Sequence, residues 1–198
     1  TRDNNGHGTH VAGLIASKSV GNGGFVGSAS GVDLYIAKVS STTEGATGLF
    51  TSAIARALNY AIANKIDIIN CSYSMPTTLS TAEEQAYTAV LNAGILLVFA
   101  SGNSGNATLP EFANRAGVIT VGNINVDDVR NGSSYGEYLK FSCYGTSVMS
   151  CSREHKSGFE AMSGTSQASP VMAGIAAMYM QLFPELTREQ LVQKMIDN

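Results

Sequence analysis

Three short segments rich in small residues carry side chains that could act together on a carbonyl group. His7 lies between two glycines, Asn103 follows a Ser-Gly pair, and Ser166 lies in the run 163–169. A histidine can move protons near neutral pH, a serine hydroxyl becomes a nucleophile when a base takes its proton, and an asparagine N–H can stabilise an oxyanion. These three residue types together are sufficient for acyl transfer.

Each of these residues also has an ordinary structural explanation when it is considered alone. Ser166, at the start of a helical pattern, is typical of an N-cap, and Asn103, between a predicted strand and Gly105, is typical of a turn. His7 and His10 are spaced as metal ligands could be, but the glutamate of a helical zinc-protease motif is missing between them. Alone, each position favours a structural role, and no metal site is predicted.

The three segments are connected by apolar strands that alternate with amphipathic helices. Strands are predicted at 32–39, 66–71, 95–99 and 117–122, and helices at 51–64, 80–93, 166–183 and 187–198. Capping boxes at Ser80 and Thr187 mark two helix starts, and a further helix is expected to begin near His7. Near-continuous apolar strands between helices predict a three-layer α/β domain, with a mostly parallel central sheet and helices on both faces.

The composition is typical of a globular domain and gives no sign of a strongly charged binding partner. The 198 residues are 44% hydrophobic and 14% charged, and the net charge is −3. Twelve basic residues against fifteen acidic ones, with no long Lys/Arg run, argue against nucleic acid as a partner. No long stretch of uncharged apolar residues occurs, so no membrane span is predicted.

In their order along the chain, the three segments resemble the subtilisin-like serine proteases, the subtilase family. The resemblance is carried by Gly6-His7-Gly8-Thr9-His10-Val11-Ala12-Gly13, by Ser101-Gly102-Asn103 and by Ser163-Gly164-Thr165-Ser166-Gln167-Ala168-Ser169-Pro170. The first and last runs are long and nearly unbroken, which makes them specific. Weaker similarity at 67–72, 117–122 and 134–145 extends the resemblance over essentially the whole chain. Residues 1–198 are therefore identified as one partial subtilisin-like peptidase domain.

The resemblance implies a serine endopeptidase that hydrolyses protein or peptide substrates through an acyl-enzyme. It implies His7 as general base, Ser166 as nucleophile and Asn103 as a donor to the oxyanion. His10 would be structural. The residues expected to pair with the substrate backbone as an edge strand are Ser72, Tyr73 and Ser74. The residues expected to form a wall of the pocket before the scissile bond are Ala100, Ser101 and Gly102.

The aspartate that orients the histidine in this family has no counterpart in the sequence. Asp3 belongs to the approach to the histidine motif, and Asp33 and Asp67 lie at predicted strand starts, away from the strand ends where His7 is expected. We therefore expect an upstream segment to supply the triad aspartate, and a further C-terminal element to be missing. Losing this acid costs on the order of 10⁴ in kcat in a serine protease.

Two other functions are alternatives to a protease. A non-catalytic or incomplete subtilase-like domain, binding peptide or packing in a larger assembly, would explain the missing aspartate, whereas the presence of His7, Asn103 and Ser166 favours an enzyme. An esterase on another α/β fold would carry Gly-x-Ser-x-Gly, but Ala168 stands where the second glycine would be.

The resemblance implies no required cofactor, with calcium possible as a structural ion. The loop 21–27 lies where the family has an ion-binding loop, but it contains no carboxylate, so a plain turn is the simpler interpretation.

Cys71 is expected in the core, and Cys143 and Cys151 could be paired or reduced. Many relatives are secreted, so we expect an extracellular protein, with an intracellular location as the alternative.

Overall fold

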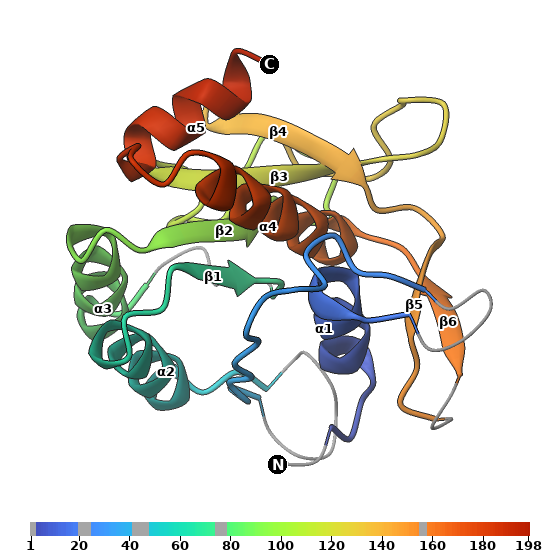
Figure 1. Cartoon of the computed structure of the whole chain (residues 1–198), viewed down its shortest axis with the longest axis horizontal. Coiled ribbons are helices and arrows are strands. Elements are labelled where there is room, and N and C mark those ends of the chain that lie inside the picture. Colours follow the sequence, from blue (N-terminus) through green and yellow to red (C-terminus); the bar gives the residue numbers. More distant parts are fainter. Residues whose placement is uncertain (1–2, 20–24, 41–47, 74–78, 155–157) are drawn as a thin grey trace.

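The computed structural model describes residues 3–19, 25–40, 48–73, 79–154 and 158–198. The helices are α1 (His7–Ala16), α2 (Thr51–Ala63), α3 (Thr81–Asn92), α4 (Thr165–Leu182) and α5 (Arg188–Ile196). The strands are β1 (Ile68–Cys71), β2 (Leu96–Ala100), β3 (Val118–Ile124), β4 (Leu139–Tyr144), β5 (Val148–Cys151) and β6 (Phe159–Met162). Figure 1 shows how these elements are arranged.

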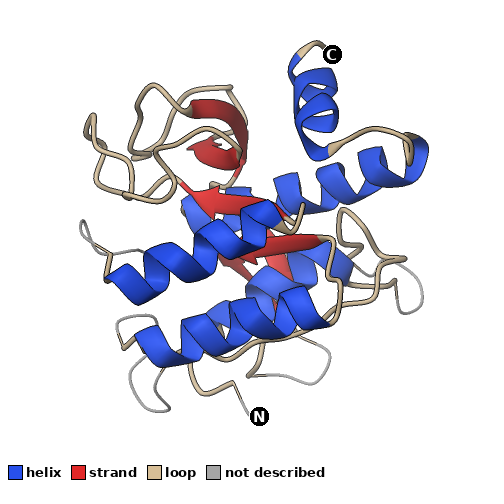
Figure 2. Cartoon of the chain, turned by 90° about the vertical axis from the view of Figure 1, so that its left-hand side faces the viewer, coloured by secondary structure: helices blue, strands red, loops and turns tan. Residues whose placement is uncertain are grey.

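A parallel four-stranded sheet forms the middle layer, in the order β1-β2-β3-β4. Its register pairs Ile69 with Leu97 and Val98 with Ile119. β5 and β6 form a separate antiparallel hairpin. Helices lie on both faces of the larger sheet (Figures 1 and 2), so the predicted three-layer α/β fold is confirmed.

Alternate residues of the central strands supply two separate cores. Leu97 and Phe99 of β2 face α2 and α3, where Tyr87 is completely buried. Leu96 and Val98 face α4 and α5 on the other side. Because side chains alternate along a strand, a run with no polar residue is what a strand covered on both faces requires.

Most of the predicted elements are present within a few residues of their expected bounds. Both predicted capping boxes form, with Ser80 accepting from the Glu83 N–H and Thr187 from the Gln190 N–H. The strands β4, β5 and β6 were not predicted, because their residues mix exposed and buried positions in short runs.

The strand predicted at 32–39 is wrong. This segment is extended, but it belongs to no strand, and its apolar side chains are largely exposed: Tyr35 by 59% and Ile36 by 65%. The physical reason is that a strand exists only when another strand accepts its backbone hydrogen bonds, and none is paired with it in the described part of the chain.

Two further expectations can be compared with the described residues. Cys71, Cys143 and Cys151 are all free thiols, and burial raises the pKa of Cys71 to about 12 and that of Cys143 to about 11. Among the described helices, none is both long enough and apolar enough to cross a membrane.

Candidate active site

One cleft of about 420 Å³ brings the three predicted catalytic residues together. His7 is the first residue of α1, Asn103 follows β2, and Ser166 lies in the first turn of α4. Among the described residues, the cleft is lined by His7, Ser72, Tyr73, Asn103, Met162, Ser163, Ser166 and Gln167. His7 and Ser166, which are 159 positions apart in the sequence, therefore share one cleft.

Asp3 fixes the start of α1, and with it the position of His7. Its carboxylate accepts from the N–H groups of Asn5 (2.9 Å), Gly6 (3.0 Å) and Thr9 (2.8 Å), and from the Thr9 hydroxyl (2.7 Å). Partial burial raises the pKa of Asp3, but these hydrogen bonds outweigh it and hold the pKa well below its usual range. The Asp3 carboxylate therefore accepts hydrogen bonds from backbone N–H groups at the start of α1, as a helix-capping side chain does.

The surroundings of His7 favour its neutral form. Burial lowers its pKa most, the nearby His10 lowers it further, and the charge of Asp3 raises it. A neutral imidazole is the form that can accept a proton from a serine hydroxyl. No carboxylate in the described part of the chain hydrogen-bonds the His7 ring, so the acid of a complete triad is not among the described residues.

The side chain of Asn103 is held by the start of α4. Its Oδ1 accepts from the N–H of Thr165 at 2.9 Å and from the Thr165 hydroxyl at 3.0 Å. The same hydroxyl accepts from the N–H of Gly102 at 3.2 Å. Because the carbonyl oxygen is the atom that these bonds hold, the Nδ2 group of Asn103 keeps its N–H donors for another acceptor.

Ser166 lies where a helix offers unpaired backbone donors. Its N–H belongs to the first turn of α4, in which N–H groups have no acceptor within the helix. Gly164, directly before the helix, has φ +146° and its Cβ position lies 3.3 Å from Asn103 Oδ1, so only glycine fits comfortably there. Helix start and asparagine therefore approach each other closely.

Pro170, inside α4, helps to join this helix to β1. A proline has no N–H, so the carbonyl of Ser166, four residues earlier, receives no helical hydrogen bond from it. The hydroxyl of Ser72 donates to that carbonyl instead, at 2.8 Å. Asn70 Nδ2 donates to Ser72 Oγ (2.9 Å), and Ser169 Oγ donates back to Asn70 Oδ1 (2.6 Å). This network ties the nucleophile's helix to the strand.

Of the predicted substrate-binding residues, only Ser72 and Tyr73 are among the described residues that line the cleft. Ser72 and Tyr73 line the cleft, although the Ser72 hydroxyl is occupied by the Ser166 carbonyl. Ser74 lies outside the described residues. Ala100, Ser101 and Gly102 are not among the described residues that line the cleft. Ala100 ends β2, which lies between β1 and β3, and the N–H of Ser101 donates to the Val121 carbonyl.

Several residues that shape the cleft were not predicted from the sequence. Thr165, Asn70 and Ser169 act only through contacts with distant segments, although an asparagine inside the apolar run 66–71 was a usable signal, since buried polar groups need partners. Met162, Ser163 and Gln167 line the cleft beside the nucleophile.

The calcium prediction is not tested by this structure. Residues 21–24 of the loop 21–27 lie outside the described residues. In the described part of the chain, no three His, Cys, Asp or Glu side chains gather as metal ligands would.

Similarity to known proteins shows the family of the chain. The model of the subtilase family matches residues 1–198. The chain is 37% identical over 193 residues to a thermostable alkaline protease of Halalkalibacterium halodurans, covering 97% of this chain and 52% of that protein. It is also 37% identical to subtilisin DY of Bacillus licheniformis, covering 96% of this chain and 68% of that protein.

Solved structures share the fold. A cold-adapted subtilisin-like serine proteinase matches with a TM-score of 0.81 at 30% identity, over 96% of this chain and 66% of that one. Sphericase matches with a TM-score of 0.83 at 27% identity, over 98% of this chain and 69% of that one. The chain thus spans about half to two thirds of the relatives it matches. It belongs to the subtilase family of peptidases.

Proposed function

We propose that this protein is a serine endopeptidase that cleaves peptide bonds through an acyl-enzyme on Ser166. His7 takes the proton of the Ser166 hydroxyl as its oxygen attacks the peptide carbonyl carbon, and then gives it to the leaving amine. The tetrahedral oxyanion receives hydrogen bonds from Asn103 Nδ2 and from the backbone N–H of Ser166. Water then hydrolyses the acyl-enzyme by the reverse proton path.

The observation that carries this proposal is the meeting of His7, Asn103 and Ser166 in one cleft. Two details support it. Burial favours neutral His7, which a general base requires, and Thr165 holds the carbonyl end of Asn103 so that the amide end stays available. Membership of the subtilase family, whose matched relatives are named as proteases, supports it independently.

The acid of the triad is proposed to come from a segment upstream of residue 1. His7 has no carboxylate partner among the described residues, and Asp3 is engaged by backbone donors. The same observation favours a second candidate: residues 1–198 by themselves would bind peptide without turning it over at a useful rate. Location outside the cell and a structural calcium ion stay predictions from the family resemblance.

A fluorophosphonate probe, which reacts with activated serine hydroxyls, tests the proposal. The full-length protein should be labelled, and Ser166→Ala should abolish labelling, because the attacking oxygen is removed. Mass spectrometry of the labelled peptide should place the probe on Ser166.

The matched control is Ser142→Ala, which removes an exposed serine of β4 outside the cleft and should leave labelling unchanged. Labelling that survives Ser166→Ala would falsify the assignment of the nucleophile. Absence of labelling in the folded full-length wild type would favour the peptide-binding candidate.

A further inference from the structure

Tyr73 belongs both to the cleft and to the hydrophobic core beneath it. It lines the cleft, and it also packs against the core cluster that contains Tyr87, Phe99 and Phe112. Its ring meets that of Phe99 edge-on, with 6.3 Å between the ring centroids. A change in the core can therefore reach the cleft through Tyr73.

The hydroxyl of Tyr73 is bound to core residues and not to the cleft. It lies 2.7 Å from the hydroxyl of Tyr87, a completely buried residue of α3. It also donates to Cys71 Sγ at 3.4 Å. Because a tyrosine has a single hydroxyl proton, Tyr87 is then the donor between the two tyrosines. Neither Tyr87 nor Cys71 is among the described residues that line the cleft.

Burial keeps all three of these groups neutral. It raises the pKa of Cys71 to about 12, raises that of Tyr73 well above its ordinary value, and raises that of Tyr87 as well. A neutral thiol is a weak acceptor, so the bond to Tyr87 is the stronger of the two that the Tyr73 hydroxyl makes among the described residues.

Tyr87 is itself held in place by aromatic packing. Its ring lies 4.5 Å from that of Phe112 and 5.5 Å from that of Phe99, measured between centroids. The helix that carries it begins at the capping box of Ser80. The Tyr87 hydroxyl therefore has a fixed position in the core, from which it holds Tyr73.

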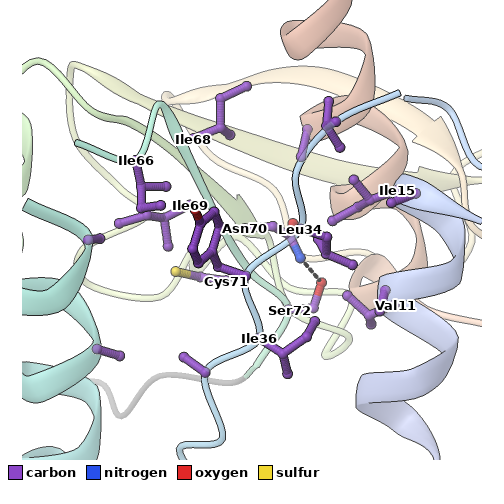
Figure 3. A pocket seen from close by; sticks show the side chains of 18 of the residues that line it. Val11, Ile15, Leu34, Ile36, Ile66, Ile68, Ile69, Asn70, Cys71 and Ser72 are labelled. Carbon is purple, nitrogen blue, oxygen red and sulfur yellow. Dashed lines mark hydrogen bonds between the residues drawn. The ribbon is translucent and has the colours of Figure 1, made fainter. Parts of the chain in front are cut away.

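The residue before Tyr73 is anchored from the opposite face of the sheet. Ser72 donates to the Ser166 carbonyl of α4, and the core beside α4 lies across the sheet from the core beside α3. Figure 3 shows the Cys71 sulfur on one side of β1 and the hydrogen-bonded pair of Asn70 and Ser72 on the other. The two residues that follow β1 are thus held from both faces.

We propose that Tyr87 is a positioning residue for peptide binding: its buried hydroxyl holds Tyr73 in the core, so that the Tyr73 hydroxyl stays out of the cleft and residues 72–73 stay in place for a substrate backbone. This inference rests on the proposed function, because it names a determinant of peptide binding in the same cleft. Tyr87 itself acts only through Tyr73.

The physical reason is the cost of a buried hydroxyl without a good acceptor or donor. If the Tyr87 hydroxyl is removed, the Tyr73 hydroxyl keeps only the weak thiol partner among the described residues. A buried polar group in this state gains free energy by turning to water, and the cleft that Tyr73 lines offers that water. The ring would then move into the space that a peptide occupies.

Two single variants and their combination distinguish positioning from a general contribution to the core. Tyr87→Phe removes the anchor and keeps the Tyr73 hydroxyl, so peptide affinity should fall about 5- to 10-fold. Tyr73→Phe removes the hydroxyl that would turn to the cleft, so affinity should stay within about threefold of the parent, although stability falls because Tyr87 loses a buried hydrogen bond. The double variant should bind like Tyr73→Phe, because replacing both partners leaves neither hydroxyl in the core.

Affinity is measured by fluorescence anisotropy on the full-length protein carrying Ser166→Ala, which prevents cleavage, with the fluorescent peptide Ala-Ala-Ala-Leu-Ala-Ala as probe. The matched control is Tyr179→Phe, which removes a tyrosine hydroxyl of α4 in the other core cluster and should leave affinity unchanged.

Fluorophosphonate labelling of the same variants, with Ser166 intact, is the second readout. This probe has no peptide backbone to pair with residues 72–73, so Tyr87→Phe should leave its rate within about twofold of the wild type. A loss of peptide affinity without a loss of labelling is what a positioning role predicts and a general loss of structure does not.

Unchanged affinity in Tyr87→Phe would overturn the proposal, and so would a double variant that binds no better than Tyr87→Phe. A loss of about tenfold or more in Tyr73→Phe would contradict it even if Tyr87→Phe does not fold, because the Tyr73 hydroxyl would then act on the peptide itself. Equal slowing of labelling, or no saturable binding by the parent, would also refute it. Because affinity is measured on a Ser166→Ala chain, a wild type that is not labelled would contradict the proposed hydrolysis and leave the binding result valid.

Discussion

Thr165 is the residue on which the geometry beside the nucleophile depends. It is completely buried, and its one hydroxyl both donates to Asn103 and accepts from Gly102. It thereby joins the loop after β2 to the start of α4. Thr165 is not among the described residues that line the cleft, and it contacts the cleft through Asn103, so we regard it as a positioning residue.

Thr165→Val should slow fluorophosphonate labelling of the full-length protein about 5- to 10-fold. The change keeps the shape of the side chain but removes a hydroxyl whose hydrogen bonds are each worth about 1 kcal/mol, so Asn103 would be held less firmly. Thr165→Ser keeps the hydroxyl and should restore most of the rate.

A double-variant cycle separates positioning from a general loss of stability. In an Asn103→Leu background, Thr165→Val should slow labelling no further, because the side chain that it positions is gone. Equal slowing in both backgrounds would show that Thr165 does not act through Asn103.

At the scale of elements, α1 must lie very close to β5 for His7 to reach the cleft. A Cβ at Gly13 would meet the Ser150 hydroxyl and would lie 2.8 Å from Cys151 Sγ, so no larger residue fits. Ser150 donates to the His10 carbonyl at 2.7 Å, and His10 Nε2 lies 3.1 Å from the carbonyls of Val148 and Glu160. The helix is thus fastened to both strands of the hairpin.

Gly13→Ala should destabilise the protein by up to about 2 kcal/mol, because overpacking costs about 1–3 kcal/mol and outweighs the roughly 1 kcal/mol that alanine gains in a helix. Urea unfolding measures the change as a lower midpoint. Gly31→Ala is the matched control: its Cβ would meet nothing within 4 Å, so its midpoint should be unchanged or slightly higher. A wild-type midpoint for Gly13→Ala would contradict the close packing of α1 on β5.

At the scale of the whole molecule, two histidines are held in their neutral form by folding. Burial lowers the pKa of His7, and burial also lowers that of His10 despite the carbonyls that it contacts. His10 Nδ1 is buried without a hydrogen-bond partner, so a proton added there would be left unsatisfied. The unfolded chain, whose histidines titrate near 6.5, therefore binds more protons than the folded chain below that pH.

The free energy of unfolding of residues 1–198 should therefore decrease as pH is lowered from 7.5 to 5.5. Asp3 and Glu83 do not oppose this, because their lowered pKa values stabilise the fold above 3.8 and 4.5 and that contribution is lost only at lower pH. Urea unfolding at both pH values measures the difference. His7→Gln removes one of the titrating groups and should reduce it. Stability that stays constant or rises over this interval would rule out histidine burial as a determinant.

The sequence by itself determined the features that depend on neighbouring residues. Helix starts at Ser80 and Thr187 follow from capping residues three positions apart, and β2 and β3 follow from continuous apolar runs. The long runs around His7 and Ser166 identified the family, because a match of that length does not depend on tertiary contacts.

Only the tertiary structure decided what depends on contacts between distant segments. The segment 32–39 has the composition of a strand, but pairing decides whether a strand forms, and no partner accepts it in the described part of the chain. Ala100 and Ser101 were expected at a pocket and are buried, because the sheet continues on both sides of β2. Local residue types predict an element, whereas its neighbours determine which of its side chains can reach a substrate.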